Sequence, residues 1–77
     1  MSIFKKLDKF NIDITSLRNG LNFLNINISK FEKLDIEISD ELSKTFLAIA
    51  NLSPKSSKEE QKVYRQKINQ LFFENNI

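Results

Sequence analysis

Three related segments decide how this chain folds: Leu7-Asp-Lys-Phe-Asn-Ile-Asp-Ile-Thr15, Leu21-Asn-Phe-Leu-Asn-Ile-Asn-Ile-Ser29 and Phe31-Glu-Lys-Leu-Asp-Ile-Glu-Ile-Ser39. Each has two apolar residues three positions apart, then Asn or Asp, Ile, a second polar residue, Ile, and Thr or Ser. The second segment starts 14 residues after the first, and the third starts 10 residues after the second. Because the spacing is unequal, the segments do not indicate a solenoid with a fixed period.

In the favoured interpretation, each segment ends one short helix and begins the next. The two apolar residues form the last helical turn, and an Asx residue followed by β-branched isoleucines disfavours its continuation. Thr15, Ser29 or Ser39 then caps the following helix, and Glu32 completes a capping box with Ser29. This interpretation predicts a mostly α protein, a small bundle of about five short capped helices at 2–9, 15–24, 29–34, 39–51 and 57–74.

The Ile-x-Ile pieces also fit strands, which is the first alternative. An α+β protein would then contain a three-stranded sheet from residues 10–38, with alternate apolar residues on one face. Asn19-Gly20 would form a tight hairpin turn between two of the strands. The alternation fails at Leu17 and Leu24, so this sheet needs a bulge.

A second alternative is one long coiled-coil helix over residues 2–33. Apolar residues form an unbroken heptad seam from Ile3 to Phe31, which would make the chain a self-assembling coiled-coil protein. Ile12 and Ile26 would then lie on the outer face, and the Asn, Thr, Ser and Gly residues of this region weaken a helix.

The last third of the chain predicts an antiparallel helical hairpin. Apolar residues recur at helical spacing after Ser39, and Pro54 forces the preceding residue out of the helical conformation. Ser57 and Glu60 form a second capping box that begins the last helix. We therefore expect a single small globular domain over 1–77, with the repeats in residues 1–38 and the hairpin in residues 39–77.

The composition excludes most enzyme classes. The chain has 77 residues, 40% of them hydrophobic, with no cysteine, no histidine and one glycine. Catalytic relays that use an imidazole or a thiol are therefore excluded, and a zinc site would lack its usual ligands. Gly20 alone cannot form a phosphate-binding loop. The acidic residues at 35–41 are typical of a solvated helix start and lack the glycine of a calcium loop. We expect no catalysis, no cofactor and no metal.

Size and charge favour a protein partner. A domain this small buries only about 60% of its unfolded surface, so a partner would help to stabilise it. The longest apolar run, Phe46–Ala50, is too short to span a membrane, and membrane contact by the lysine-rich first helix is not favoured. Absence of cysteine fits the cytoplasm of a bacterium or an infected host cell.

The predicted function is a non-enzymatic regulator, adaptor or inhibitor that binds another protein. Its Lys, Ile and Asn content is typical of an AT-rich coding sequence, so we expect a phage or other mobile element acting on a host protein. Two apolar residues of the last helix fall outside its apolar stripe, and basic residues flank them. The predicted protein interface therefore comprises Lys62, Val63, Arg65 and Phe73.

Two other kinds of partner are considered. Residues 15–34 fit a helix-turn-helix DNA-binding regulator, in which amide and basic side chains read bases and phosphates. Its candidate DNA contacts are Arg18, Asn22, Lys30 and Lys33. The net charge of +2 is small for a nucleic-acid footprint, so DNA is not favoured. A homo-oligomer is the remaining partner considered.

Overall fold

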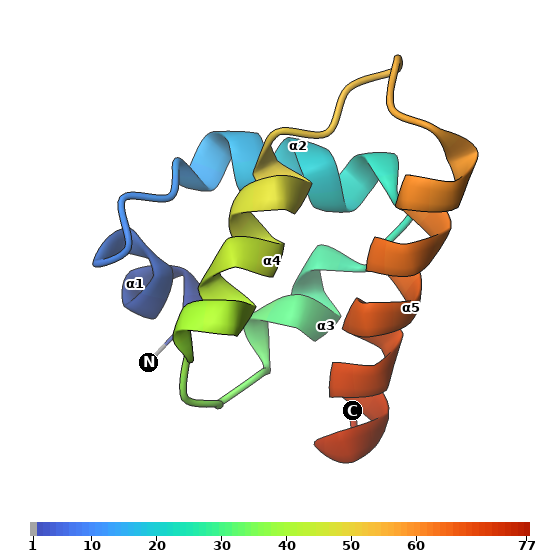
Figure 1. The fold of residues 1–77 in the computed structure, drawn as a ribbon. Helices are drawn as coiled ribbons and strands as arrows, with labels where there is room; N and C mark the ends of the chain where they lie inside the picture. Colours follow the sequence, from blue (N-terminus) through green and yellow to red (C-terminus); the bar gives the residue numbers. More distant parts are fainter. Residues whose placement is uncertain (1) are drawn as a thin grey trace.

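The structure, a computed structural model, describes residues 2–77, and these residues form five helices (Figure 1). The helices are α1 (Ile3–Asp8), α2 (Ile14–Phe23), α3 (Ile28–Glu32), α4 (Asp40–Ala50) and α5 (Lys58–Glu74). The predicted mostly α bundle of short capped helices is confirmed. Neither the three-stranded sheet nor the continuous helix over 2–33 forms in the part of the chain that the structure describes.

The repeat stops a helix by placing asparagine in the left-handed conformation. Asn11 has a φ of 59° and Asn25 a φ of 60°, and asparagine tolerates this region better than most residues. After α2, the backbone N–H of Ile26 donates to the Leu21 carbonyl over 2.9 Å, which is the long bond of a Schellman motif. The following isoleucines, Ile12 and Ile26, are buried and hold the turned chain against the core.

The repeat starts the next helix two residues earlier than predicted. Asp13 caps α2 through a 3.2 Å bond from the Thr15 backbone N–H, and Asn27 caps α3 through a 3.1 Å bond from the Lys30 N–H. Thr15 and Ser29 were therefore wrongly predicted as caps. Asp13 and Asn27 are already extended, at ψ of 114° and 113°, so their side chains reach the free N–H groups first.

The third repeat remains extended for longer. Asp35 does not adopt the left-handed conformation, and the Lys6 ammonium donates to its carboxylate and to the Ile36 carbonyl, each over 3.0 Å. The chain reaches Ser39 before a helix begins, and the Ser39 hydroxyl accepts the Leu42 N–H over 3.1 Å. Ser39 thus caps α4 as predicted.

The tightest crossing in the bundle lies between α2 and α4. Gly20 is buried within helix α2 instead of forming a hairpin turn. A Cβ at this position would overlap the backbone carbonyl of Ile49. Beneath this crossing, the Phe31 ring lies 5.5 Å from the rings of both Phe4 and Phe46, centroid to centroid. The lack of a side chain at Gly20 therefore sets how closely α4 lies on the repeat-bearing part.

The last helix runs antiparallel to α4, as the predicted hairpin requires (Figure 1). Ser57 caps α5 by accepting a hydrogen bond from the Glu60 N–H over 3.1 Å. Two residues of the apolar stripe of α5, Ile68 and Phe72, are buried in the core. The main packing partner of α4 is nevertheless α2 and not α5. No helix within residues 2–77 is long and apolar enough to cross a membrane.

Candidate functional site: a groove between α4 and α5

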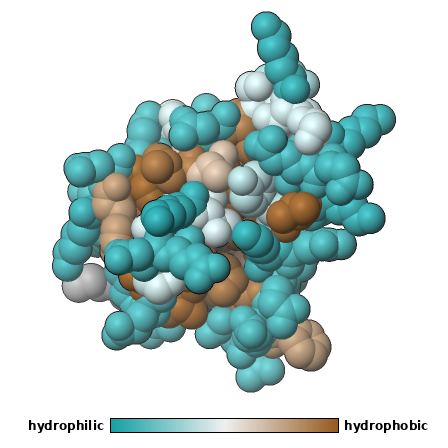
Figure 2. All heavy atoms as spheres, viewed as in Figure 1, coloured by the Kyte–Doolittle hydropathy of each residue, from teal (hydrophilic) through white to brown (hydrophobic). Residues whose placement is uncertain are grey.

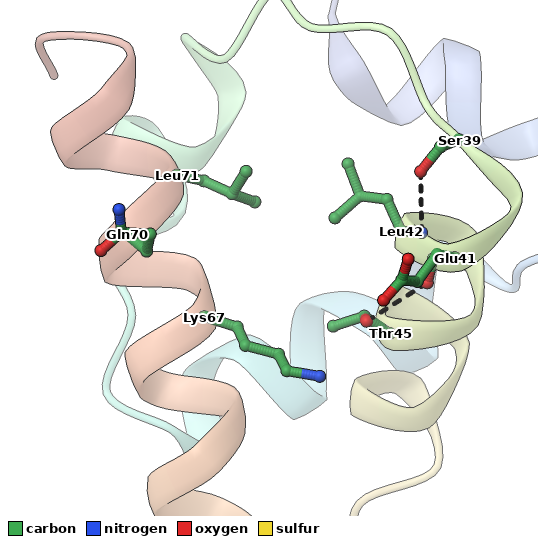
Figure 3. A pocket seen from close by; sticks show the side chains of 7 residues that line it. All are labelled: Ser39, Glu41, Leu42, Thr45, Lys67, Gln70 and Leu71. Atoms are coloured by element: carbon green, nitrogen blue, oxygen red, sulfur yellow. Dashed lines mark hydrogen bonds between the residues drawn. The ribbon is translucent and has the colours of Figure 1, made fainter.

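A groove of about 300 Å³ separates the facing sides of α4 and α5 (Figure 3). The start of α4 forms one wall and the second half of α5 forms the other. Seven residues line the groove: Ser39, Glu41, Leu42, Thr45, Lys67, Gln70 and Leu71. The groove exists because α4 lies against α2, so its other side does not close onto α5.

The walls of the groove are apolar at its centre. Leu42 and Leu71 point toward each other from opposite helices (Figure 3), and both are only half-buried although they pack on the edge of the core. Apolar atoms also reach the surface in the region between α4 and α5 in Figure 2. An incoming apolar side chain would therefore remove both leucine surfaces from water, which is favourable.

The rims of the groove carry opposite charges. Glu41 lies in the first turn of α4 and is exposed, and Lys67 extends from α5 across the groove toward Thr45 (Figure 3). The Lys67 ammonium lies 5.9 Å from the centroid of the Tyr64 ring. Neither charge forms an ion pair with another residue of the described chain, 2–77. Thr45 has no free donor for a ligand, because its hydroxyl donates to the Glu41 carbonyl over 3.3 Å.

The four residues of the predicted protein interface do not form one patch. Lys62 and Val63 are exposed, and Phe73 is 79% exposed. Val63 and Phe73 are ten positions apart in the sequence, which separates them by about 15 Å along the helix axis. Arg65 is partly buried, and its Nε donates to the Leu24 carbonyl over 2.9 Å. Arg65 therefore joins α5 to the end of α2.

The predicted DNA contact Arg18 is engaged within the protein. Its guanidinium lies 3.3 Å from a carboxylate oxygen of Glu32 and 4.6 Å from the centroid of the Phe4 ring. Glu32, predicted to cap α3 with Ser29, thus lies beside Arg18 on the surface. This arrangement places a negative charge where a phosphate contact was predicted.

Lys30 is also held by a neighbouring helix. Its ammonium lies 4.9 Å above the Phe72 ring of α5, while Asn22 and Lys33 are exposed. The second helix of the predicted helix-turn-helix, α3, has five residues, whereas a recognition helix in the major groove presents several base-reading side chains. The DNA contacts stay a prediction that the fold does not favour.

Sequence reasoning did not single out Leu42 and Leu71 as residues of a groove. Both do lie on the apolar stripes of their helices, and no local signal shows that these two stripes are incompletely covered. The fold and the groove together define a small all-α domain with an open apolar groove between two charged rims. Comparison with models of protein families, with curated proteins and with solved structures found no match to the chain.

Proposed function

We propose that this chain is a non-enzymatic protein-binding domain, a regulator, adaptor or inhibitor whose groove receives a helical segment of a partner protein. The supporting observation is the pair of half-buried leucines, Leu42 and Leu71, which face each other across a groove of about 300 Å³. This volume is at the lower end of the range of about 300–1,000 Å³ for small-molecule pockets. It suits one or two apolar side chains presented by an amphipathic helix.

Burial of apolar surface would favour such docking. Fully burying a large aliphatic side chain contributes about 1.5–3 kcal/mol, and the incoming anchor would cover the exposed parts of both groove leucines as well. The rim charges add specificity and orientation to this apolar contact more than they add affinity.

A second hollow of the surface, of about 250 Å³, is a weaker candidate. It is lined by Lys6, Lys9, Phe10, Glu37 and Ile38. The Lys6 ammonium is already bonded to Asp35 and to the chain that follows it, and Phe10 is the apolar residue with most exposure there, at 37%. Three of the five residues that line this hollow are charged, whereas the centre of the groove is apolar.

The experiment compares two tryptophan substitutions on α5. Gln70→Trp adds a large side chain to the rim of the groove, and Gln66→Trp adds the same side chain at another exposed position of the helix. A displayed library of amphipathic helical peptides is selected for binding to the unmodified chain. We expect the selected peptides to lose binding to Gln70→Trp and to keep binding to Gln66→Trp, with both variants folded by circular dichroism.

Two outcomes contradict this proposal. A library that yields no binder at all removes helix docking. The second outcome is that the selected peptides still bind Gln70→Trp but no longer bind Phe73→Ser. Because Phe73 is exposed and does not line the groove, this result would place the binding surface on the face predicted from the sequence.

A further inference from the structure

The two rims of the groove specify the charge of whatever lies between them. We infer that the partner segment is an amphipathic helix with a basic edge facing α4 and an acidic edge facing α5, on either side of an apolar stripe. This inference rests on the proposed function, because it names the partner of the same groove. The occupant is therefore neither a uniformly basic nor a uniformly acidic segment.

The α4 rim is negative. Glu41 lies in the first turn of α4 and lines the groove directly. Its side chain is exposed and forms no ion pair within residues 2–77. A lysine or arginine on the adjacent edge of a partner helix would meet an unneutralised carboxylate there.

The α5 rim is positive. Lys67 is the one charged residue of α5 among those that line the groove, and Gln70 beside it is neutral. The lysine side chain extends over the groove and not away from it (Figure 3), near the face of the Tyr64 ring. Its charge therefore faces the same apolar space as Glu41, from the other side.

Opposite rim charges select partners as the flanking charges of paired coiled-coil helices do. Such pairs are exposed, so each contributes a modest amount of free energy, but a like charge in the same place is unfavourable and excludes wrong partners. A helix with unlike edges can satisfy both rims at once. A helix with two basic or two acidic edges satisfies one rim and is repelled by the other.

The test uses three synthetic helical peptides that share one leucine stripe. Their edges carry lysine and glutamate, lysine on both edges, or glutamate on both edges, and their affinities are measured by fluorescence anisotropy at low salt. The unmodified chain should bind the mixed peptide about two- to five-fold more tightly than either of the others, the upper part of the range expected for an exposed charge pair.

Charge reversal should change the preferred peptide. Glu41→Lys makes both rims positive and should prefer the glutamate-edged peptide, while Lys67→Glu makes both rims negative and should prefer the lysine-edged peptide. The matched controls are Asp40→Lys, a first-turn acid that does not line the groove, and Lys62→Glu, an exposed lysine elsewhere on α5. Both controls should keep the preference for the mixed peptide.

The outcomes separate this inference from the proposed function. If all three peptides bind equally and Gln70→Trp abolishes their binding, the groove binds helices but the charge inference is wrong. If no peptide binds, helix docking in the groove fails as well. If sedimentation shows a dimer that Lys67→Glu dissociates, the occupant is a second copy of the chain and the inference is overturned.

Discussion

The substitution Gly20→Ala tests the crossing that creates the groove. In an exposed helix, alanine is favoured over glycine by about 0.5–1 kcal/mol. At Gly20 the new Cβ would overlap the carbonyl carbon and oxygen of Ile49 and come within 3.0 Å of its Cγ2. Two of these three atoms belong to the backbone of α4, so no rotamer change relieves the overlap and the two helices must move apart.

The expected result is a net loss of stability. Overpacking a well-packed core costs about 1–3 kcal/mol, and separating α2 from α4 also loosens Leu17, Leu21 and Phe46, which are 0% exposed. After subtracting the gain in helix propensity, we expect a destabilisation of about 1–2 kcal/mol. In a domain of this size that corresponds to a Tm lower by about 4–16 °C.

Urea denaturation followed by circular dichroism measures this change, with Asn22→Ala as the matched control. Asn22 is exposed on the same helix, so its replacement reports helix propensity alone and should stabilise the domain by a few tenths of a kcal/mol. The reasoning is refuted if Gly20→Ala stabilises the domain as much as Asn22→Ala does.

Further substitutions at Asn25, Asp13 and Lys6 test the local signals that define the helix ends and the third repeat. Asn25→Ala should cost about 1–2 kcal/mol, because alanine is strained at positive φ, while Asn25→Gly should be close to neutral; thermal denaturation compares the two. Asp13→Ala should cost about 0.5–2 kcal/mol by removing the cap of α2, and a Thr15→Ala variant that is equally destabilised in urea would contradict this assignment. The hydrogen bond and charge of Lys6 lower the pKa of Asp35, so their stabilisation is present above the ordinary aspartate pKa and is lost as the pH falls through the lowered value. Lys6→Met should raise the pKa of Asp35 toward its ordinary value in an NMR titration, and an unchanged pKa would show that the ion pair does not form in solution.

Most of the fold could be predicted because the signals that end one helix and begin the next lie close together in the sequence. Asparagine, isoleucine and a second Asx residue in succession supply a left-handed stop, a buried contact and a new cap within four positions, as at 11–14 and 25–28. The residues that end one helix and cap the next therefore all belong to the repeat itself. The helices predicted from it agree with those observed to within one or two residues, the usual uncertainty of a helix end.

The two wrongly predicted caps lie where the sequence offers two capping residues close together. Asp13 and Thr15 are both good capping residues, and so are Asn27 and Ser29. The choice depends on how far the chain has turned after the left-handed asparagine, which a propensity does not specify. At Ser39 the competing upstream residue is Glu37, a poorer cap, and there the prediction was correct.

The groove could not be predicted because it depends on which helix α4 contacts. Gly20 allows α4 to pack closely on α2, while the hydrogen bond from Arg65 to the Leu24 carbonyl joins α5 to the end of α2. Both helices of the hairpin are thus attached to the same earlier element instead of to each other along their length. Leu42 and Leu71, which would close a simple helical hairpin, are left facing across an open space. Their helical spacing is the same in either arrangement, so only the long-range contacts of Gly20 and Arg65 distinguish a closed core from an open groove.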